Sequence, residues 1–168
     1  MNIYNSQIED IDHIFELYKT ATDYQNKKFM VAWPSFDRNL VEKEIIENRQ
    51  WKLVIDHQIA CVWAVTDSDP EIWGARNNDP SIYIHRISTN PNFRGRNFVK
   101  NIVTWSKKYA SKRNKKYIRM DTVGENIGLT NHYKKCGFDF LGLSKLQHTS
   151  ELPLHYQNAT VSLFQISV

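Results

Sequence analysis

The chain has 168 residues, of which 41% are hydrophobic and 24% are charged, as expected for a globular protein with a proper core. This length predicts a single domain over residues 1–168. The formal net charge of +4 suits an anionic ligand, but it lacks the dense basic stripe of a dedicated nucleic-acid binder, so nucleic acid is not an expected partner.

Hydrophobic periodicity predicts the elements of the first half. A short strand at 2–5 precedes a helix whose apolar residues recur at helical spacing from Ile8 to Tyr18. A second helix is expected from about Arg38 to Asn48. Strands 51–55 and 59–65 follow, separated by three residues, which is a hairpin-sized gap.

The second half alternates strands and helices. After the turn-rich residues 66–80, these elements are strand 81–89, a helix from Phe98 to Ala110, strand 116–122, a helix from Asn126 to Cys136, and strands near 138–143 and 160–167. Gly137 is well placed as the left-handed cap of the second of these helices. The alternation, with the antiparallel hairpin before it, predicts an α/β domain built on a mixed sheet.

The N-terminal residues and the cysteines indicate a cellular compartment. The first twelve residues, MNIYNSQIEDID, contain no apolar signal-peptide region, and no run of eighteen apolar residues occurs. Cys61 and Cys136 match neither a metal-ligand spacing nor a disulfide framework. We therefore expect a cytoplasmic protein with reduced thiols, no bound metal and no membrane partner.

Residues 90–99, NPNFRGRNFV, join a predicted strand to a predicted helix. The first backbone N–H groups of a helix and its dipole form a ready anion site. Arg94 and Arg96 add forked cationic donors, and Gly95 lets the backbone come close to a ligand or adopt positive φ. The segment predicts a pyrophosphate cradle; a solvated turn with two surface arginines is the alternative.

A second motif, ENIGLTNHYKKCGF, covers residues 125–138. Asn126 and Tyr133 are seven residues apart, which places an amide and a phenol on nearly the same helical face. A tyrosine that merely fills the core is the alternative interpretation.

Residues 84–98 and 121–138 together resemble the GNAT superfamily of acetyl-coenzyme A-dependent N-acetyltransferases, and the order of elements matches across nearly the whole chain. The resemblance implies a mixed, mostly antiparallel sheet of six to seven strands. Helices would flank both faces, and a central parallel pair would be splayed. It also implies acetyl transfer from acetyl-CoA to the amine of a small molecule or peptide, and homodimers are common in the family.

The same resemblance implies roles for individual residues. Backbone groups of Ile87, Ser88 and Thr89 would pair with the pantetheine arm, and Asn126 would bond near it. Tyr133 would face the sulfur as general acid for the departing thiolate. The full set implied to bind the cofactor is Ile87, Ser88, Thr89, Arg94, Gly95, Arg96, Asn97, Phe98, Val99, Asn126 and Tyr133.

One departure concerns the pyrophosphate loop. The family has small residues where this chain has Asn97 and Val99. Asparagine tolerates left-handed backbone and can cap a helix, whereas a β-branched valine hinders close approach to a phosphate. This difference leaves open whether coenzyme affinity is weakened, and it leaves open a degenerate coenzyme A-binding module without turnover.

The general base and the acceptor are less defined. Some relatives use a glutamate near the start of the fourth strand, where this chain has Ser81, so His85 is the preferred base, acting through water. Asp121 and Glu125 are further candidates, and a histidine packed in the strand is the alternative. Candidates to line the acceptor pocket are Phe29, Trp33, Trp63, Trp73, His148, His155 and Tyr156. The acceptor amine itself stays open.

Overall fold

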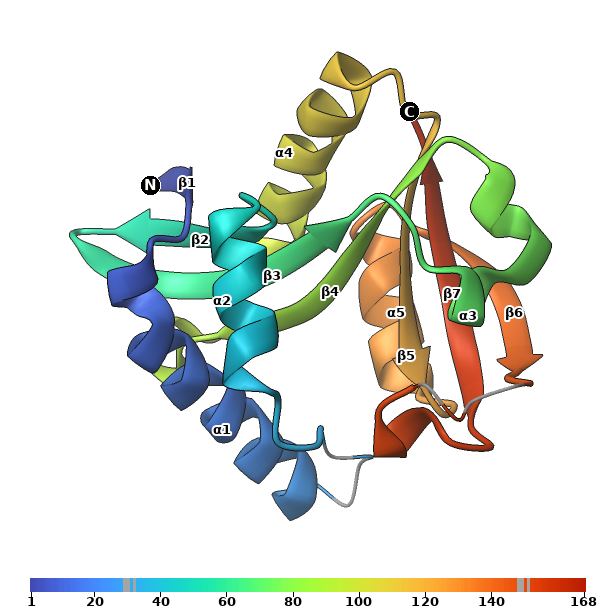
Figure 1. The fold of residues 1–168 in the computed structure, drawn as a ribbon, viewed down its shortest axis with the longest axis horizontal. Helices are drawn as coiled ribbons and strands as arrows, with labels where there is room; N and C mark the ends of the chain where they lie inside the picture. The colour runs from blue at the N-terminus through green and yellow to red at the C-terminus, as the bar shows by residue number, and fades with distance from the viewer. Residues whose placement is uncertain (29–30, 32, 148–149, 151) are drawn as a thin grey trace. The chain divides into compact units, whose positions relative to one another are not determined.

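The computed structural model describes residues 1–28, 31, 33–147, 150 and 152–168. Within these residues, seven strands form one sheet in the order β1-β2-β3-β4-β5-β7-β6 (Figure 1). β4 and β5 pair in parallel, whereas the β1–β2, β2–β3, β5–β7 and β6–β7 pairs are antiparallel. The predicted mixed sheet, flanked by helices and with one parallel pair, is confirmed.

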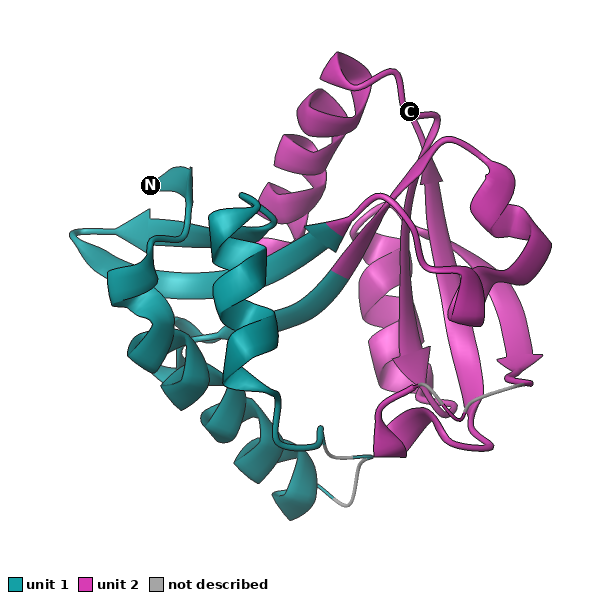
Figure 2. Ribbon diagram, in the orientation of Figure 1, with its two compact units in different colours: residues 1–65, 85–96 teal, residues 66–84, 97–168 magenta. Residues whose placement is uncertain are grey.

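The chain divides into two compact units, residues 1–65 with 85–96 and residues 66–84 with 97–168 (Figure 2). Unit 1 holds β1 (Asn2–Asn5), η1 (Ile8–Asp10), α1 (Ile11–Lys27), α2 (Arg38–Ile46), β2 (Gln50–Ile55), most of β3 (Gln58–Thr66), the second half of β4 (Ser81–Thr89) and η3 (Pro91–Phe93). Unit 2 holds α3 (Pro70–Trp73), η2 (Gly74–Asn78), the first half of β4, α4 (Phe98–Lys112), β5 (Tyr117–Val123), α5 (Ile127–Lys135), β6 (Asp139–Lys145), η4 (Leu154–Tyr156) and β7 (Thr160–Ser167).

The core of unit 1 follows from the apolar spacing of its helices. α1 buries Ile14 and Tyr18 against Val41 of α2 and Val62 of β3, so both helices share one core cluster. The Asp37 carboxylate accepts a hydrogen bond from the Asn39 N–H at 3.0 Å and begins α2.

The hairpin between β2 and β3 turns at Asp56 and His57, which have φ angles of 47° and 64°. Positive φ at both central residues is the geometry that two-residue hairpins prefer, because its twist matches that of the strands.

Unit 2 is tied together by Arg119 of β5, whose side chain is 2% exposed. Its guanidinium donates to Gln165 Oε1 at 2.8 Å, to Asp79 Oδ2 at 2.6 Å and to the Arg76 carbonyl. It lies 4.9 Å from the ring centroid of Trp73 and 4.8 Å from that of Tyr117. η2, β5 and β7 therefore share one buried cation.

Two features differ from the sequence expectations. Residues 66–80 contain α3 and η2, and the second predicted helix ends at Ile46. α3 begins with Pro70 and has four residues, too few for a periodic apolar pattern to reveal it. Among the described helices, none combines the length and the apolar character needed to cross a bilayer.

Candidate functional site

The predicted pyrophosphate loop is accessible in the structure. Arg94, Gly95 and Arg96 are exposed directly before α4, and Gly95 has a φ of +82°. The guanidinium of Arg94 lies 4.6 Å from the ring centroid of Tyr24. This stacking orients the Arg94 side chain, and the N–H groups of its exposed guanidinium can still donate to an anion.

Asn97 ends the loop in left-handed backbone, with φ 51° and ψ 52°, as asparagine allows. It occupies the N-cap position of α4, but its side chain makes no capping bond to the helix. Its Oδ1 instead accepts a hydrogen bond from the Cys136 thiol at 3.4 Å. Phe98 is buried at the start of α4 and Val99 is half-buried. Because α4 has no acidic residue in its first turn, nothing there opposes an anion.

The end of β4 is anchored through its side chains. Ser88 Oγ donates to the Leu17 carbonyl at 2.8 Å, and Thr89 Oγ1 donates to the Cys61 sulfur at 3.7 Å. Ile87, between them and Arg86, is half-buried. Any role of residues 87–89 toward a ligand therefore falls to their backbone groups.

The second motif forms α5 as predicted, but Asn126 lies outside the helix. It is the N-cap, and its Oδ1 accepts from the Leu129 N–H at 2.9 Å. Its amide oxygen therefore has a structural task, and the predicted bond to a cofactor arm would fall to the amide nitrogen. Tyr133 is 8% exposed. The centroid of its ring lies 5.1 Å from that of Phe164 and 5.9 Å from that of Phe138.

His85, the preferred base, has a weakly basic imidazole. Burial, with the nearby cations of Arg86 and Arg49, lowers the pKa of His85 to about 3. At neutral pH the ring is uncharged and accepts a proton poorly. A histidine packed in the strand was the alternative interpretation of the sequence, but the contribution of Arg49 could not be predicted, because Arg49 is distant along the chain.

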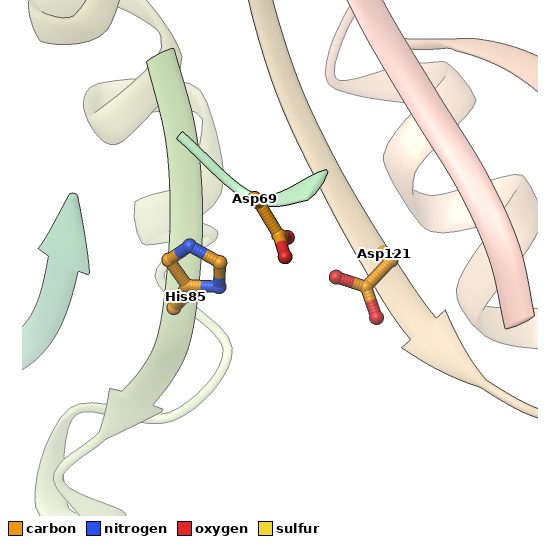
Figure 3. A group of neighbouring side chains, drawn as sticks. All are labelled: Asp69, His85 and Asp121. Atoms are coloured by element: carbon orange, nitrogen blue, oxygen red, sulfur yellow. The ribbon is translucent and has the colours of Figure 1, made fainter. Parts of the chain in front are cut away.

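Unit 2 contains a pair of carboxyl groups that the sequence did not single out as a pair. Oxygens of Asp69 and Asp121 lie within 4.8 Å of each other, and Figure 3 shows the two side chains turned toward each other, with His85 of unit 1 also drawn. Burial, and then the charges of Asp121 and Glu71, raise the pKa of Asp69 to about 8.

Asp121 accepts a hydrogen bond from the Tyr156 hydroxyl at 2.8 Å. Burial raises the pKa of Asp121 to about 6, although that hydrogen bond favours the charged form. Burial thus raises the pKa of both carboxyl groups, that of Asp69 further than that of Asp121. Two acids whose pKa values are pushed apart in this way can act as base and acid in the same place.

The residues predicted to line the acceptor pocket divide between core and partly accessible positions. Trp63 and Trp73 are buried in the core, whereas Trp33, His155 and Tyr156 are half-buried. Phe29 and His148 lie outside the described residues. Glu125, the remaining predicted candidate for the base, is exposed.

A groove of about 560 Å³ lies in unit 1, and it contains none of the predicted site residues. The lining includes an ion pair and two histidines. The lining residues are Tyr4, Asp10, His13, Lys52, Val54, His57, Gln58, Ile59 and Asn90. Lys52 donates to Asp10 at 2.5 Å, which leaves the groove close to neutral.

Comparisons with known proteins agree with this fold. The model of the acetyltransferase (GNAT) family matches residues 18–138. The uncharacterized N-acetyltransferase YesJ of Bacillus subtilis (strain 168) is 28% identical over 79 residues, which cover 47% of this chain and 44% of that protein. The chain thus matches less than half the length of this relative.

Solved structures share the fold. A GNAT-family acetyltransferase from Listeria monocytogenes 4b F2365 superposes with a TM-score of 0.79 at 18% identity, covering 99% of this chain and 94% of that one. A Bacillus anthracis (strain Ames) protein in complex with acetyl coenzyme A has a TM-score of 0.53 at 17% identity, covering 71% and 61%.

Proposed function

Because the chain belongs to the acetyltransferase (GNAT) family, we propose that it transfers the acetyl group of acetyl-CoA to an amine by direct attack in a ternary complex. The observation that carries this proposal is the exposed Arg94–Gly95–Arg96 turn directly before α4, with positive φ at Gly95 and Asn97. Backbone N–H groups and two guanidinium groups there suit a pyrophosphate. The Bacillus anthracis neighbour in complex with acetyl coenzyme A supports the choice of cofactor.

The leaving thiolate needs a proton, and we assign its donation to Tyr133. A phenol with an ordinary pKa near 10 holds its proton more tightly than a thiol, so it can protonate sulfur as the bond breaks. The ring is fixed by Phe164 and Phe138, which limits its motion. A backbone N–H near Ile87 would stabilise the oxyanion.

The attacking amine must lose a proton, and the structure favours Asp121 over His85 for that role. A base with a pKa of about 6 is ionised at neutral pH, whereas an imidazole with a pKa of about 3 is a far weaker acceptor. The Tyr156 hydroxyl orients the Asp121 carboxylate. The buried acidic pair also suits a cationic amine, which would compensate the charge of Asp121.

The test of the proposal is coenzyme binding by Arg94→Ala, measured by calorimetry with acetyl-CoA and CoA. Loss of charged hydrogen bonds to phosphate is expected to raise Kd about tenfold or more. Arg113→Ala is the matched control, since Arg113 is also exposed and stacks on a tyrosine, 4.4 Å from the Tyr109 ring. Equal Kd values for wild type and Arg94→Ala would exclude the pyrophosphate role.

A second candidate function is coenzyme binding without turnover, favoured by Asn97 and Val99 at positions where the family has small residues. The two candidate functions are distinguished by an assay of thiol release from acetyl-CoA with a broad panel of amines. Binding without thiol release from any amine would favour the second function.

A further inference from the structure

Arg86 has an unusual backbone conformation in the second half of β4. Its φ is +51°, a region that L-residues with a Cβ avoid because Cβ approaches the following carbonyl oxygen. Among the described residues, the other non-glycine positions with positive φ are Asn48, Asp56, His57, Asn97, Asn114 and Asn158. All of these are Asn, Asp or His outside strands, so Arg86 is the exception in both residue type and location.

The side chain of Arg86 is held from two helices of unit 1. Its Nη2 forms an ion pair with Glu44 of α2, whose side chain is 4% exposed. Its Nε donates to the Tyr18 hydroxyl of α1 at 3.3 Å, and its guanidinium lies 5.3 Å from the Phe36 ring centroid. Such contacts allow the surrounding structure to impose a strained backbone.

The strained residue precedes the backbone groups assigned to the cofactor arm. Left-handed backbone inside a strand turns the next peptide away from the regular ladder, as in a bulge. Two residues later, Ser88 is fixed again by its hydrogen bond to the Leu17 carbonyl. The peptide of Ile87 is thus held on both sides.

Stability alone does not account for this arrangement. A buried ion pair rarely adds net stability over apolar residues, and glycine or asparagine would adopt the same backbone with less strain. Glu44 moreover has a second cation, Arg49, at 3.6 Å. The choice of arginine at position 86 calls for a role beyond packing.

We propose that Arg86 is a positioning residue: through its ion pair with Glu44 it holds the left-handed turn that aims the Ile87 N–H at acetyl-CoA. This inference rests on the proposed function. Neither Arg86 nor Glu44 touches the reacting atoms; both act through the backbone of β4.

The test uses variants of the full chain that separate backbone conformation from anchoring. Arg86→Gly adopts positive φ without strain but cannot reach Glu44. Combined with Glu44→Gln, it also avoids a buried unpaired carboxylate. Arg86→Lys keeps a cation, and Arg49→Gln is the matched control, because it removes the other arginine from the same carboxylate. Acetyl-CoA affinity is measured by calorimetry, and amide hydrogen exchange of residues 87–89 by NMR.

We expect Arg86→Gly and the double variant to bind acetyl-CoA about tenfold or more weakly and to exchange these amides faster, since small misplacements are costly in aligned sites. Arg86→Lys should recover part of the affinity, and Arg49→Gln should match wild type. Folded variants with wild-type affinity would overturn the positioning role, even if exchange rises. A wild-type chain that binds no coenzyme would instead overturn the proposed function and this role with it.

Discussion

Asp69→Asn should change how the free energy of unfolding depends on pH. With a pKa of about 8 in the folded chain and about 3.9 when unfolded, Asp69 binds more protons in the folded state throughout the intervening range. Stability contributed by the protonated group is therefore greatest at low pH and is lost as the pH rises toward 8. One proton difference corresponds to about 1.4 kcal/mol per pH unit, so the expected change between pH 5 and 7 is about 3 kcal/mol.

The asparagine variant keeps the size and polarity of the side chain but cannot ionise. Urea unfolding of both proteins at half-unit steps from pH 5 to 8 gives the difference in unfolding free energy at each pH. The variant should gain stability relative to wild type as the pH rises. His155, whose pKa is lowered by burial, titrates in both proteins and cancels in this difference.

Asp67→Asn is the control for this experiment. Asp67 is an exposed carboxylate of the same segment that pairs with Lys115 at 3.2 Å. Its variant should run parallel to wild type across the pH range. If the Asp69→Asn curve also ran parallel to wild type, the burial argument for the carboxyl pair would be wrong.

Three further predictions concern the proposed reaction. Tyr133→Phe should lower turnover about 100-fold and leave coenzyme affinity nearly unchanged, because only the proton donor is lost. For wild type, kcat/KM should rise as pH increases through about 6, where Asp121 ionises, and Asp121→Asn should remove that limb of the profile. Cys136→Ala removes the thiol that donates a hydrogen bond to Asn97. The Kd for CoA should therefore rise about fivefold, which corresponds to the free energy of one hydrogen bond. In an Asn97→Gly background the same substitution should have no further effect on Kd.

Each of these has an outcome that contradicts it. A collapse of CoA affinity in Tyr133→Phe would make the phenol structural. Loss of the limb near pH 6 in His85→Gln, with Asp121→Asn unaffected, would return the role of base to the imidazole. Additive effects of Cys136→Ala and Asn97→Gly would show that the thiol acts independently of Asn97.

The elements with strong local signals could be predicted from the sequence. The apolar β4 and the helix ended by Gly137 were located within a few residues, since their patterns depend on near neighbours, whereas α1 was found but continues nine residues beyond Tyr18 to Lys27. α3 and η2 were missed because short helices leave no periodic trace. The family resemblance then supplied the strand pairing, which periodicity alone does not define.

Site chemistry was less accessible than fold. The roles proposed for Arg94 and Gly95 come from a local pattern, a charged glycine turn before a helix. The pKa of His85 and the Asp69–Asp121 pair depend on residues far apart in sequence, and one sequence carries no measure of such proximity. The contact between Asn97 and Cys136 was equally hidden, at a separation of 39 residues.

The buried guanidinium of Arg119 has a consequence for how unit 2 opens. Release of the Arg76–Asp79 turn by itself would leave a desolvated cation between Trp73 and Tyr117 without its anionic partner. Local fraying of this turn is therefore costly, because it leaves a buried charge unpaired. Amide protons of η2, β5 and β7 should exchange together, as one cooperative folding unit.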